Sequence, residues 1–326
     1  MSQTLLLEAR NLTKHFPVRR GLLSRTIGVV RAVDGVTFSV SVGKTLGLVG
    51  ESGCGKTTTA KLVLKLEDPT AGELRFEGRD IGGLDGDGVR GYRRAVQAVF
   101  QDPYASLNPR MRVDAIIAEP LVTHERLDGA EVAKRVSRLI DLVGLPERTA
   151  RLFPHEFSGG QRQRIAIARS LALSPRLVVL DEPVSALDVS IRAQILNLLR
   201  DLQAQLGLSY LFIAHDLAAV AHMSHTIAVM YLGQIVEIGD AQTIATRPQH
   251  PYTQALFAAA LPSHPSETRQ EMVLSGEVPS PLNPPPACRF HPRCPHAMPR
   301  CSAEEPVLRE TDGRRLVSCH LFASPA

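Results

Sequence analysis

The chain has 326 residues, and its 37 Lys and Arg against 33 Asp and Glu give a formal net charge of +4. With 44% hydrophobic and 21% charged residues, the composition is that of a globular protein and excludes a disordered chain. The small, diffuse charge gives no support for a nucleic-acid partner. The absence of Trp and the 5% of aromatic residues argue against a surface for stacking bases.

The N-terminal region contains only a short apolar run, Leu5 to Leu7, before the charged residues Glu8 and Arg10. This run is too short for the apolar region of a signal peptide. No stretch approaches the ~18 consecutive apolar residues of a membrane-spanning helix. We therefore expect a chain that stays in the cytosol with its thiols reduced.

Along the chain, short apolar segments alternate with segments of helical periodicity. Residues 1–47 have the alternation of half-buried strands, most clearly from Val36 to Val42. Further strands are predicted at 46–49, 95–100, 176–180 and 208–214, and helical segments at 113–152 and 190–205. This order predicts a mostly parallel sheet with helices on its faces.

Polar residues stand where three of these strands end: Gln101 after one, Asp181 and Glu182 after another, and His215 after a third. Ligands of such sheets bind at the carboxyl ends of the strands. We therefore expect these four side chains at one edge of the sheet. Taken singly, a strand-end Gln is often a surface group and a strand-end His is often structural.

The strand at 46–49 runs into Gly50-Glu-Ser-Gly-Cys-Gly-Lys56-Thr57, which matches the phosphate-binding pattern G-x-x-x-x-G-K-[ST]. The glycines let backbone amides surround a phosphate, Lys56 can reach the β- and γ-phosphates, and Thr57 offers a hydroxyl to Mg²⁺. Cys54 is either a reactive thiol or simply a small loop residue. The alternative for the whole segment is a plain Gly-rich turn.

Asp181 and Glu182 close an apolar strand and can be read as a Mg²⁺ ligand followed by a general base. On their own, two acids after a strand could equally be a solvated turn. Their place downstream of a phosphate loop favours the catalytic interpretation.

A second candidate anion site begins at Ser158, followed by Gly159, Gly160 and Gln161 and then by an Ala- and Leu-rich helix, 165–173. Ser158 can cap that helix, and the glycines leave its N-terminal amides uncovered. One nucleotide does not need two such sites in one chain. A head-to-tail pair of chains, each offering one site to the other's nucleotide, would use both.

In these motifs and their order, residues 3–255 resemble the ATP-binding subunits of ABC transporters. The resemblance implies an α/β P-loop NTPase cassette (1–255) with an antiparallel β subdomain and a helical insert at about 105–155. A small Pro- and Cys-rich C-terminal domain (256–326) would follow. It also implies that two cassettes close on two ATP molecules and reopen after hydrolysis.

The resemblance implies a role for each matching residue. Glu182, His215 and Gln101 would be catalytic, and Thr57, Gln101 and Asp181 would hold Mg²⁺. The ATP-binding set would be Phe16, stacked on adenine; Gly50, Ser52, Gly53, Gly55, Lys56, Thr57 and Thr58 of the loop; Ser158, Gly159, Gly160 and Gln161 of the signature; and Asp188. Phe16 could instead be a core residue.

Four further segments resemble the dipeptide and oligopeptide importers, in particular their F-type chain: 100–110, 250–253, 276–281 and 284–294. The implied partners are a D-type ATPase chain, two membrane permeases and an external solute-binding protein. The implied location is peripheral, on the cytoplasmic face of the membrane. Importers of nickel, opines or oligosaccharides share much of this pattern. A soluble ABC ATPase acting on ribosomes or DNA is the other alternative, but it usually has two cassettes or a long insertion.

Four of the five cysteines, Cys288, Cys294, Cys301 and Cys319, lie in the tail with the spacing C-x5-C-x6-C-x17-C. In a reduced, loop-rich segment they indicate a metal or cluster site. The close C-x2-C pairs of common zinc sites are missing. Four thiolates suit a [4Fe–4S] cluster, which relatives with this tail are thought to bind; zinc and no metal are the alternatives.

Overall fold

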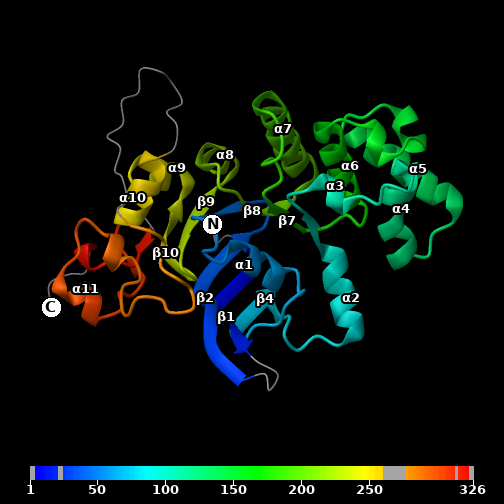
Figure 1. Cartoon of the computed structure of the whole chain (residues 1–326). Coiled ribbons are helices and arrows are strands. Elements are labelled where there is room, and N and C mark those ends of the chain that lie inside the picture. The colour runs from blue at the N-terminus through cyan, green and yellow to red at the C-terminus, as the bar shows by residue number, and fades with distance from the viewer. Residues whose placement is uncertain (1–3, 21–24, 260–275, 313–314, 323–326) are drawn as a thin grey trace. The chain divides into compact units, whose positions relative to one another are not determined.

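The computed structural model describes residues 4–20, 25–259, 276–312 and 315–322 (Figure 1). Its contacts divide the chain into two compact units. The first is built mainly from Gly83–Phe212, with Val40–Lys44. The second contains Leu7–Ser39, Thr45–Gly82 and the described residues from Ile213 onward. Each unit is described by itself.

The second unit contains a four-stranded antiparallel sheet in the order β2-β1-β4-β5. Its members are β1 (Leu5–Arg20), β2 (Arg25–Ser41), β4 (Ala71–Phe76) and β5 (Arg79–Asp80). The alternation seen in the sequence has a structural cause, since Val36, Phe38 and Val40 of β2 are buried and the residues between them are exposed. The predicted antiparallel β subdomain is confirmed.

A second sheet runs through the same unit, with strands in the order β11-β12-β10-β9-β3. They are β3 (Thr45–Val49), β9 (Thr226–Tyr231), β10 (Gln234–Asp240), β11 (Arg309–Glu310) and β12 (Leu316–Val317). All five residues of β3 are buried, and β3 pairs parallel with β9. The tail strands β11 and β12 continue this sheet beyond β10 in antiparallel pairing.

This unit also contains the short helices α1 (Lys56–Val63), α8 (Leu217–Met223), α9 (Ala241–Thr246) and α10 (Pro251–Ala258). Helix α8 packs directly on β3 at Gly47. A Cβ atom there would lie 2.5 Å from Cγ1 of Val220 and 2.4 Å from Oγ of Ser224. Only glycine permits this approach.

The first unit holds the strands β6 (Val96–Val99), β7 (Leu177–Asp181) and β8 (Ser209–Ile213). Strands β6 and β7 are parallel, with Val99 opposite Leu180. The helices α2 (Gly86–Ala95), α6 (Gly159–Leu171) and α7 (Val189–Leu206) accompany them. The predicted α/β class with parallel strands is confirmed.

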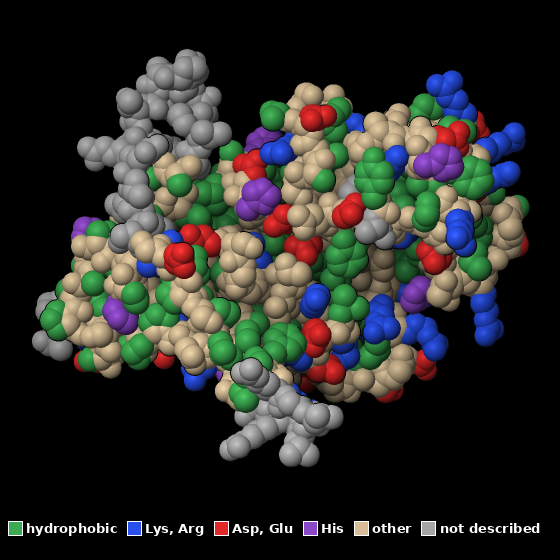
Figure 2. Space-filling model, viewed as in Figure 1, with side chains coloured by type: hydrophobic (Ala, Val, Ile, Leu, Met, Phe, Trp, Pro, Cys, Tyr) green, Lys and Arg blue, Asp and Glu red, His purple; other side chains and the backbone are tan. Residues whose placement is uncertain are grey.

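The predicted helical insert consists of three α-helices and two 3₁₀ turns. They are α3 (Pro103–Ser106), α4 (Val113–His124), α5 (Gly129–Leu142), η1 (Glu147–Arg151) and η2 (Pro154–Glu156). Helix α4 packs on α5 and α6 through apolar residues such as Ile117 and Ile140. Lys and Arg side chains project from the surface of this helical region (Figure 2).

The described part of the tail contains little regular structure: η3 (His291–Arg293), α11 (Pro299–Ala303) and η4 (His320–Phe322), besides β11 and β12. Its buried Phe290 packs on Tyr231, 5.3 Å away between ring centroids, and on Tyr252, at 5.5 Å. The tail therefore gains its apolar core from β9 and α10 of the same unit. Among the described residues, no helix is both long and apolar enough to cross a membrane.

Candidate functional site: a phosphate-binding loop, a capped signature helix and a cysteine cluster

The loop Gly50–Thr57 connects β3 to α1 and depends on glycine at two points. Gly50 and Gly55 have positive φ angles of 150° and 114°. A Cβ atom on Gly50 would lie 2.1 Å from the carbonyl oxygen of Met230, and one on Gly55 would lie 2.1 Å from that of Ala32. The loop is thus pressed against neighbouring backbone in a conformation that other residues cannot adopt.

Lys56 is the first residue of α1, and its buried ammonium group lies inside this loop. Its Nζ donates hydrogen bonds to the carbonyl oxygens of Gly50, at 2.8 Å, and Glu51, at 3.0 Å. Thr57 and Ser52 are exposed, and Thr58 is half-buried. A positive charge and a helix N-terminus therefore lie together, as a phosphate site requires.

Cys54 is buried within the loop, and its Sγ lies 3.7 Å from Nζ of Lys56. Burial raises the pKa of the Cys54 thiol, although Lys56 opposes the shift. The group therefore stays a neutral thiol, which supports the interpretation of Cys54 as a small loop residue.

Ser158 caps helix α6, as the sequence predicts, but the helix begins earlier than expected, at Gly159. The Ser158 N–H donates to Oε1 of Gln161 at 3.0 Å, and the Gln161 N–H donates to Oγ of Ser158 at 3.4 Å. The two predicted signature residues thus form a reciprocal capping box.

Gly159 and Gly160 bring the start of α6 against the segment that begins α7. A Cβ atom on Gly160 would lie 2.5 Å from Cγ2 of Ile191, and one on Gly159 would lie 3.2 Å from Cδ2 of Leu187. Between those two contacts stands Asp188, exposed at the N-cap of α7. The signature and Asp188 are therefore neighbours within the first unit.

Asp181 is the last residue of β7, and Glu182 follows it in the left-handed region with a φ of 50°. A non-glycine residue in this conformation is strained. The turn is closed by Ser185, whose Oγ donates to the Glu182 carbonyl oxygen at 3.0 Å. Because β6 and β7 are parallel and in register, Gln101, two residues beyond β6, lies at the same sheet edge as Asp181.

Two further predicted residues, His215 and Phe16, belong to the second unit, as the phosphate-binding loop does. His215 is exposed and lies two residues beyond β8, just before Asp216, which caps α8. Phe16 lies in β1 and is half-buried, with Nζ of Lys14 at 5.0 Å from its ring centroid. Phe16 is thus a surface aromatic rather than a core residue.

The four tail cysteines are free thiols, and all four lie within electrostatic reach of one another. Burial, together with the nearby Cys288, Cys294 and Cys301, raises the pKa of Cys319 to about 11. Burial likewise raises the pKa of Cys288 and of Cys294. Within the described ranges, no three His, Cys, Asp or Glu side chains are close enough together to hold one metal ion.

Backbone amides point at each of these sulfur atoms. The N–H groups of Phe290 and His291 face Cys288, that of His296 faces Cys294, and that of Leu321 faces Cys319. The Met298 N–H donates to Sγ of Cys301 at 3.5 Å. Amide donors favour the thiolate, so they partly oppose the rise in pKa that burial causes at Cys288, Cys294 and Cys319.

A set of buried arginines in the tail was not predicted from the sequence. Arg289, Arg293 and Arg315 are each buried and each paired with a carboxylate, on Asp34, Glu51 and Glu237 respectively. The pairs join residues far apart in the chain, so no local spacing could reveal them.

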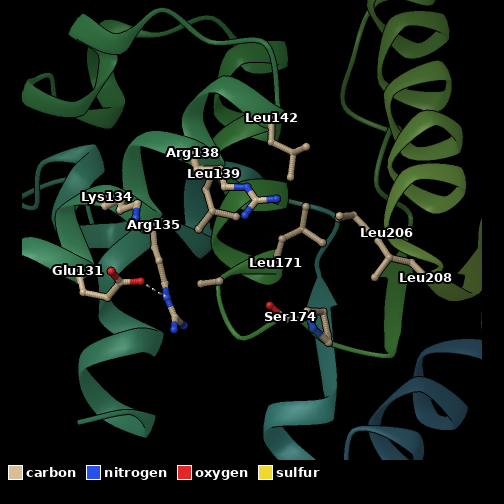
Figure 3. A pocket seen from close by; sticks show the side chains of 12 residues that line it. Glu131, Lys134, Arg135, Arg138, Leu139, Leu142, Leu171, Ser174, Leu206 and Leu208 are labelled. Atoms are coloured by element: carbon tan, nitrogen blue, oxygen red, sulfur yellow. Dashed lines mark hydrogen bonds and ion pairs between the residues drawn. The ribbon is translucent and has the colours of Figure 1, made fainter. Parts of the chain in front are cut away.

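The first unit also contains a pocket of about 520 Å³, away from all the predicted site residues (Figure 3). Leu139, Leu142, Leu171, Leu206 and Leu208 line it, with Lys134, Arg135 and Arg138 around them. Arg135 is paired with Glu131 at 3.3 Å. None of the residues that line this pocket belongs to a predicted motif.

Comparisons with known proteins agree with this geometry. A family model described as "ABC transporter" matches residues 33–185, and one described as "Oligopeptide/dipeptide transporter, C-terminal region" matches residues 236–301. The chain is 28% identical to the ATP-binding cassette MJ0796 in a dimeric structure bound to ADP and Pi, with a TM-score of 0.64 over 72% of this chain and 99% of that one.

Full-length relatives are more similar. The chain is 51% identical to the probable peptide ABC transporter ATP-binding protein y4tS of Sinorhizobium fredii, over 98% of this chain and 91% of that protein. It is 48% identical to the oligopeptide transport ATP-binding protein AppF of Bacillus subtilis, over 99% of each. The chain has the ABC ATPase cassette fold and belongs to the family of ATP-binding subunits of dipeptide and oligopeptide ABC transporters.

Proposed function

We propose that this chain is the ATP-hydrolysing subunit that powers import of dipeptides or oligopeptides across the cytoplasmic membrane. The observation that carries the proposal is the match to the peptide-transporter C-terminal region at 236–301, in addition to the cassette match. Relatives named for peptide transport are similar over both parts. We assign residues 1–255 to the cassette, with the insert at 105–155, and residues 256–326 to the C-terminal domain.

In this function the phosphate loop binds the triphosphate of ATP. The loop amides and Lys56 would contact the phosphates, and the hydroxyl of Thr57 would hold Mg²⁺ together with Asp181 and Gln101. The buried position of Lys56 supports this role, since its charge already faces the interior of the loop. Phe16, a half-buried aromatic, would stack on adenine.

The signature would bind the nucleotide of a partner cassette. Ser158, Gly159, Gly160 and Gln161 form a capped helix start whose amide end favours a phosphate, and Asp188 lies beside them. The solved relative MJ0796 is described as a dimer bound to ADP and Pi. By analogy, we expect two cassettes in a head-to-tail arrangement, the second being a D-type chain.

Glu182 would act as the general base on the attacking water, with His215 at the γ-phosphate and Gln101 sensing its presence. The strained left-handed backbone of Glu182 supports a functional role, because such strain persists where the surroundings hold it. Mg²⁺ and Lys56 would neutralise the negative charge on the phosphate oxygens, and Glu182 would accept the proton from water.

The helical insert would contact the membrane permeases on the cytoplasmic face. A pocket of about 520 Å³ there is lined by Tyr104, Leu107, Asn108, Pro109 and Arg169, among others. Its lining includes residues of the 100–110 segment that resembles peptide importers. Arg162 stacks on the exposed Tyr104 ring at 3.6 Å from its centroid, which holds this aromatic at the pocket. An external solute-binding protein would deliver the peptide to the permeases.

Cys288, Cys294, Cys301 and Cys319 fit a group larger than one metal ion, and we propose a [4Fe–4S] cluster. The four thiols lie near enough to interact electrostatically, and four cysteine ligands are the set that such a cluster takes. The amides directed at every sulfur suit a thiolate-ligated cluster as well. A bound cluster would offset the burial that otherwise keeps these groups as thiols.

Anaerobic purification tests the cluster. We expect a brown protein with iron and acid-labile sulfide near about four each per chain. Cys319→Ser should lose this iron, whereas Cys54→Ser, which changes a buried cysteine outside the cluster, should keep it. Stoichiometric zinc without iron, or no metal, would contradict the proposal.

Reconstitution tests the transport function. The chain should co-purify with membrane permeases, and proteoliposomes containing that complex should take up peptides only with ATP and the solute-binding protein present. The Glu182→Gln complex is the matched control and should not transport. Uptake of nickel, an opine or an oligosaccharide in place of peptides would overturn the substrate assignment. Association with ribosomes or DNA instead of permeases would overturn the transport function.

A further inference from the structure

A salt bridge connects the cysteine-containing tail to the phosphate-binding loop. Arg293, at the end of η3, donates from Nη1 to Oε2 of Glu51 at 2.8 Å and from Nη2 to Oε1 at 3.1 Å. The Arg293 side chain is only 6% exposed. Glu51 is the second residue of the loop Gly50–Thr57, so a residue of the tail holds a residue of the nucleotide-binding loop directly.

The backbone N–H, the carbonyl oxygen and both carboxylate oxygens of Glu51 all form hydrogen bonds. Its N–H donates to Oη of Tyr252 at 2.8 Å, and its carbonyl oxygen accepts from Nζ of Lys56 at 3.0 Å. Arg293 occupies both carboxylate oxygens. The peptide that starts the phosphate loop is thus fixed by α10, by α1 and by the tail.

The fork geometry of Arg293 makes this contact directional. A guanidinium group gives two parallel hydrogen bonds to a carboxylate, which fixes orientation as well as distance. Hydrogen bonding to Glu51 raises the pKa of Arg293, so the guanidinium group stays charged. The Arg293 side chain is buried and that of Glu51 is 29% exposed, so deletion of the arginine leaves a half-buried carboxylate without its partner beside the loop that must receive phosphate.

A second arginine supports the loop from its other side. Arg289 pairs with Asp34 and also donates to the carbonyl oxygen of Leu232. The Asp34 N–H donates to the carbonyl oxygen of Gly233, and the Gly233 N–H donates to that of Cys54, each at 2.8 Å. This chain of bonds ends inside the phosphate loop.

Both arginines are adjacent to the cysteine cluster in sequence. Arg289 directly follows Cys288, and Arg293 directly precedes Cys294. The fold of the cysteine-containing segment therefore determines where the two guanidinium groups lie. Their carboxylate partners belong to the N-terminal part of the chain, so the contacts form only when the tail is folded onto its own unit.

We propose that Arg293 is a positioning residue for ATP binding: through Glu51 it holds the phosphate loop in its receptive shape, so that the loop is complete only when the cysteine-containing tail is in place. The proposal rests on the proposed ATP-binding function and assigns the tail a part in it. Arg293 contacts no phosphate itself and acts through Glu51.

The test measures ATP affinity and steady-state ATP hydrolysis of the full chain. Arg293→Ala should raise Kd and KM for ATP by about tenfold or more while kcat changes by less than about threefold, because binding rather than chemistry is affected. Arg293→Lys, which keeps the charge but loses the fork, should recover only part of the affinity. Arg300→Ala is the matched control, since Arg300 lies in the same segment, is exposed and pairs with Glu304.

A swap of the two charges, with arginine at position 51 and glutamate at position 293, distinguishes a positioning role of the pair from a role in folding. Glu51→Arg and Arg293→Glu should each weaken ATP binding, and the double variant should bind more tightly than either single variant. If Arg293→Ala unfolds the tail, shown by newly reactive cysteine thiols, Glu51→Gln tests the pair from the loop side. Unchanged ATP affinity in folded Arg293→Ala, or in Glu51→Gln, overturns the proposal. If the unmodified chain does not bind ATP, the proposed function itself has failed.

Discussion

The ammonium group of Lys56 lies 2.8 Å from the carbonyl oxygen of Gly50, at the opposite end of the loop that both residues delimit. This hydrogen bond connects the two ends of the loop, with the charged ammonium group of Lys56 on its inner side. An incoming phosphate would compete with these carbonyl oxygens for the same ammonium group. The loop therefore carries its own internal ligand, which a nucleotide would replace.

Replacing Lys56 should weaken ATP binding. In Lys56→Ala, the loop loses the one side chain whose charge faces its interior, and we expect ATP affinity to fall by about tenfold to a hundredfold. Equilibrium titration with a fluorescent ATP analogue measures the change. Lys61→Ala, on the exposed side of the same helix α1, is the control and should bind normally. Equal losses in the two variants would show that only net charge matters.

Glu182→Gln should abolish turnover while ATP still binds. An amide of the same size cannot accept a proton from water, and we expect kcat to fall by about 10² to 10⁴. Phosphate release and nucleotide binding, measured on the same preparation, separate the two effects. Glu77→Gln is a matched control, because Glu77 also has a left-handed backbone, with φ of 53°, but is exposed on a distant turn. Unchanged hydrolysis in Glu182→Gln would sink the assignment.

Ser158→Ala should affect both stability and activity. Loss of the N-cap of α6 should lower the free energy of unfolding by about 1 kcal/mol. Asp128→Ala removes a comparable cap, since the Asp128 carboxylate accepts from the Glu131 N–H at 2.8 Å at the start of α5. Urea denaturation should give similar losses for the two variants, whereas ATP hydrolysis should fall only for Ser158→Ala. An equal fall in both would assign Ser158 a purely structural role.

His250 should make stability depend on pH. Burial lowers the pKa of His250 to about 3, and its Nδ1 accepts from the Tyr252 N–H at 3.0 Å. In the unfolded chain the imidazole of His250 is protonated below about pH 6.5, whereas in the folded chain it stays neutral at that pH. The stabilising contribution is therefore complete above about pH 6.5 and is lost as the pH falls towards about 3, by up to about 1.4 kcal/mol per pH unit.

Denaturation between about pH 7 and pH 5 measures this slope. His250→Asn keeps an acceptor for the Tyr252 N–H and should flatten the slope. His155→Asn, which changes an exposed histidine, is the control and should leave it unchanged. An identical slope in His250→Asn would contradict the assignment.

Much of the fold could be predicted because its signals are local. The apolar strand at 46–49, the glycines of the loop and the Ser158 cap each depend on neighbouring residues, and the structure has all three. The start of α6 was predicted too late, because two glycines are poor helix formers in isolation. Packing against Leu187 and Ile191 stabilises that first turn, and no local pattern contains this information.

The tail shows the limit of such reasoning more clearly. The clustering of its cysteines and prolines in the sequence indicates a distinct segment. The ion-pair partners of Arg289 and Arg293, however, lie 255 and 242 residues away in the sequence. A buried ion pair over such a separation depends on tertiary structure alone. The catalytic roles of Glu182, His215 and Gln101 remain predictions from the family resemblance.

The two short tail strands determine where the chain can be truncated without exposing its sheet. Strand β12 covers the edge of β10, and its neighbour Arg315 reaches the completely buried Glu237, with 3.5 Å between Nη1 and Oε1. A version that ends before residue 276 would uncover a strand edge and the aromatic faces of Tyr231 and Tyr252. It would also leave the Glu237 carboxylate without its arginine, with only the N–H groups of Gln249 and His250 as partners among the described residues. Exposed edges of this kind recruit strands from other molecules. A truncated cassette without the tail should therefore aggregate. Expression of a soluble protein requires the whole C-terminal segment.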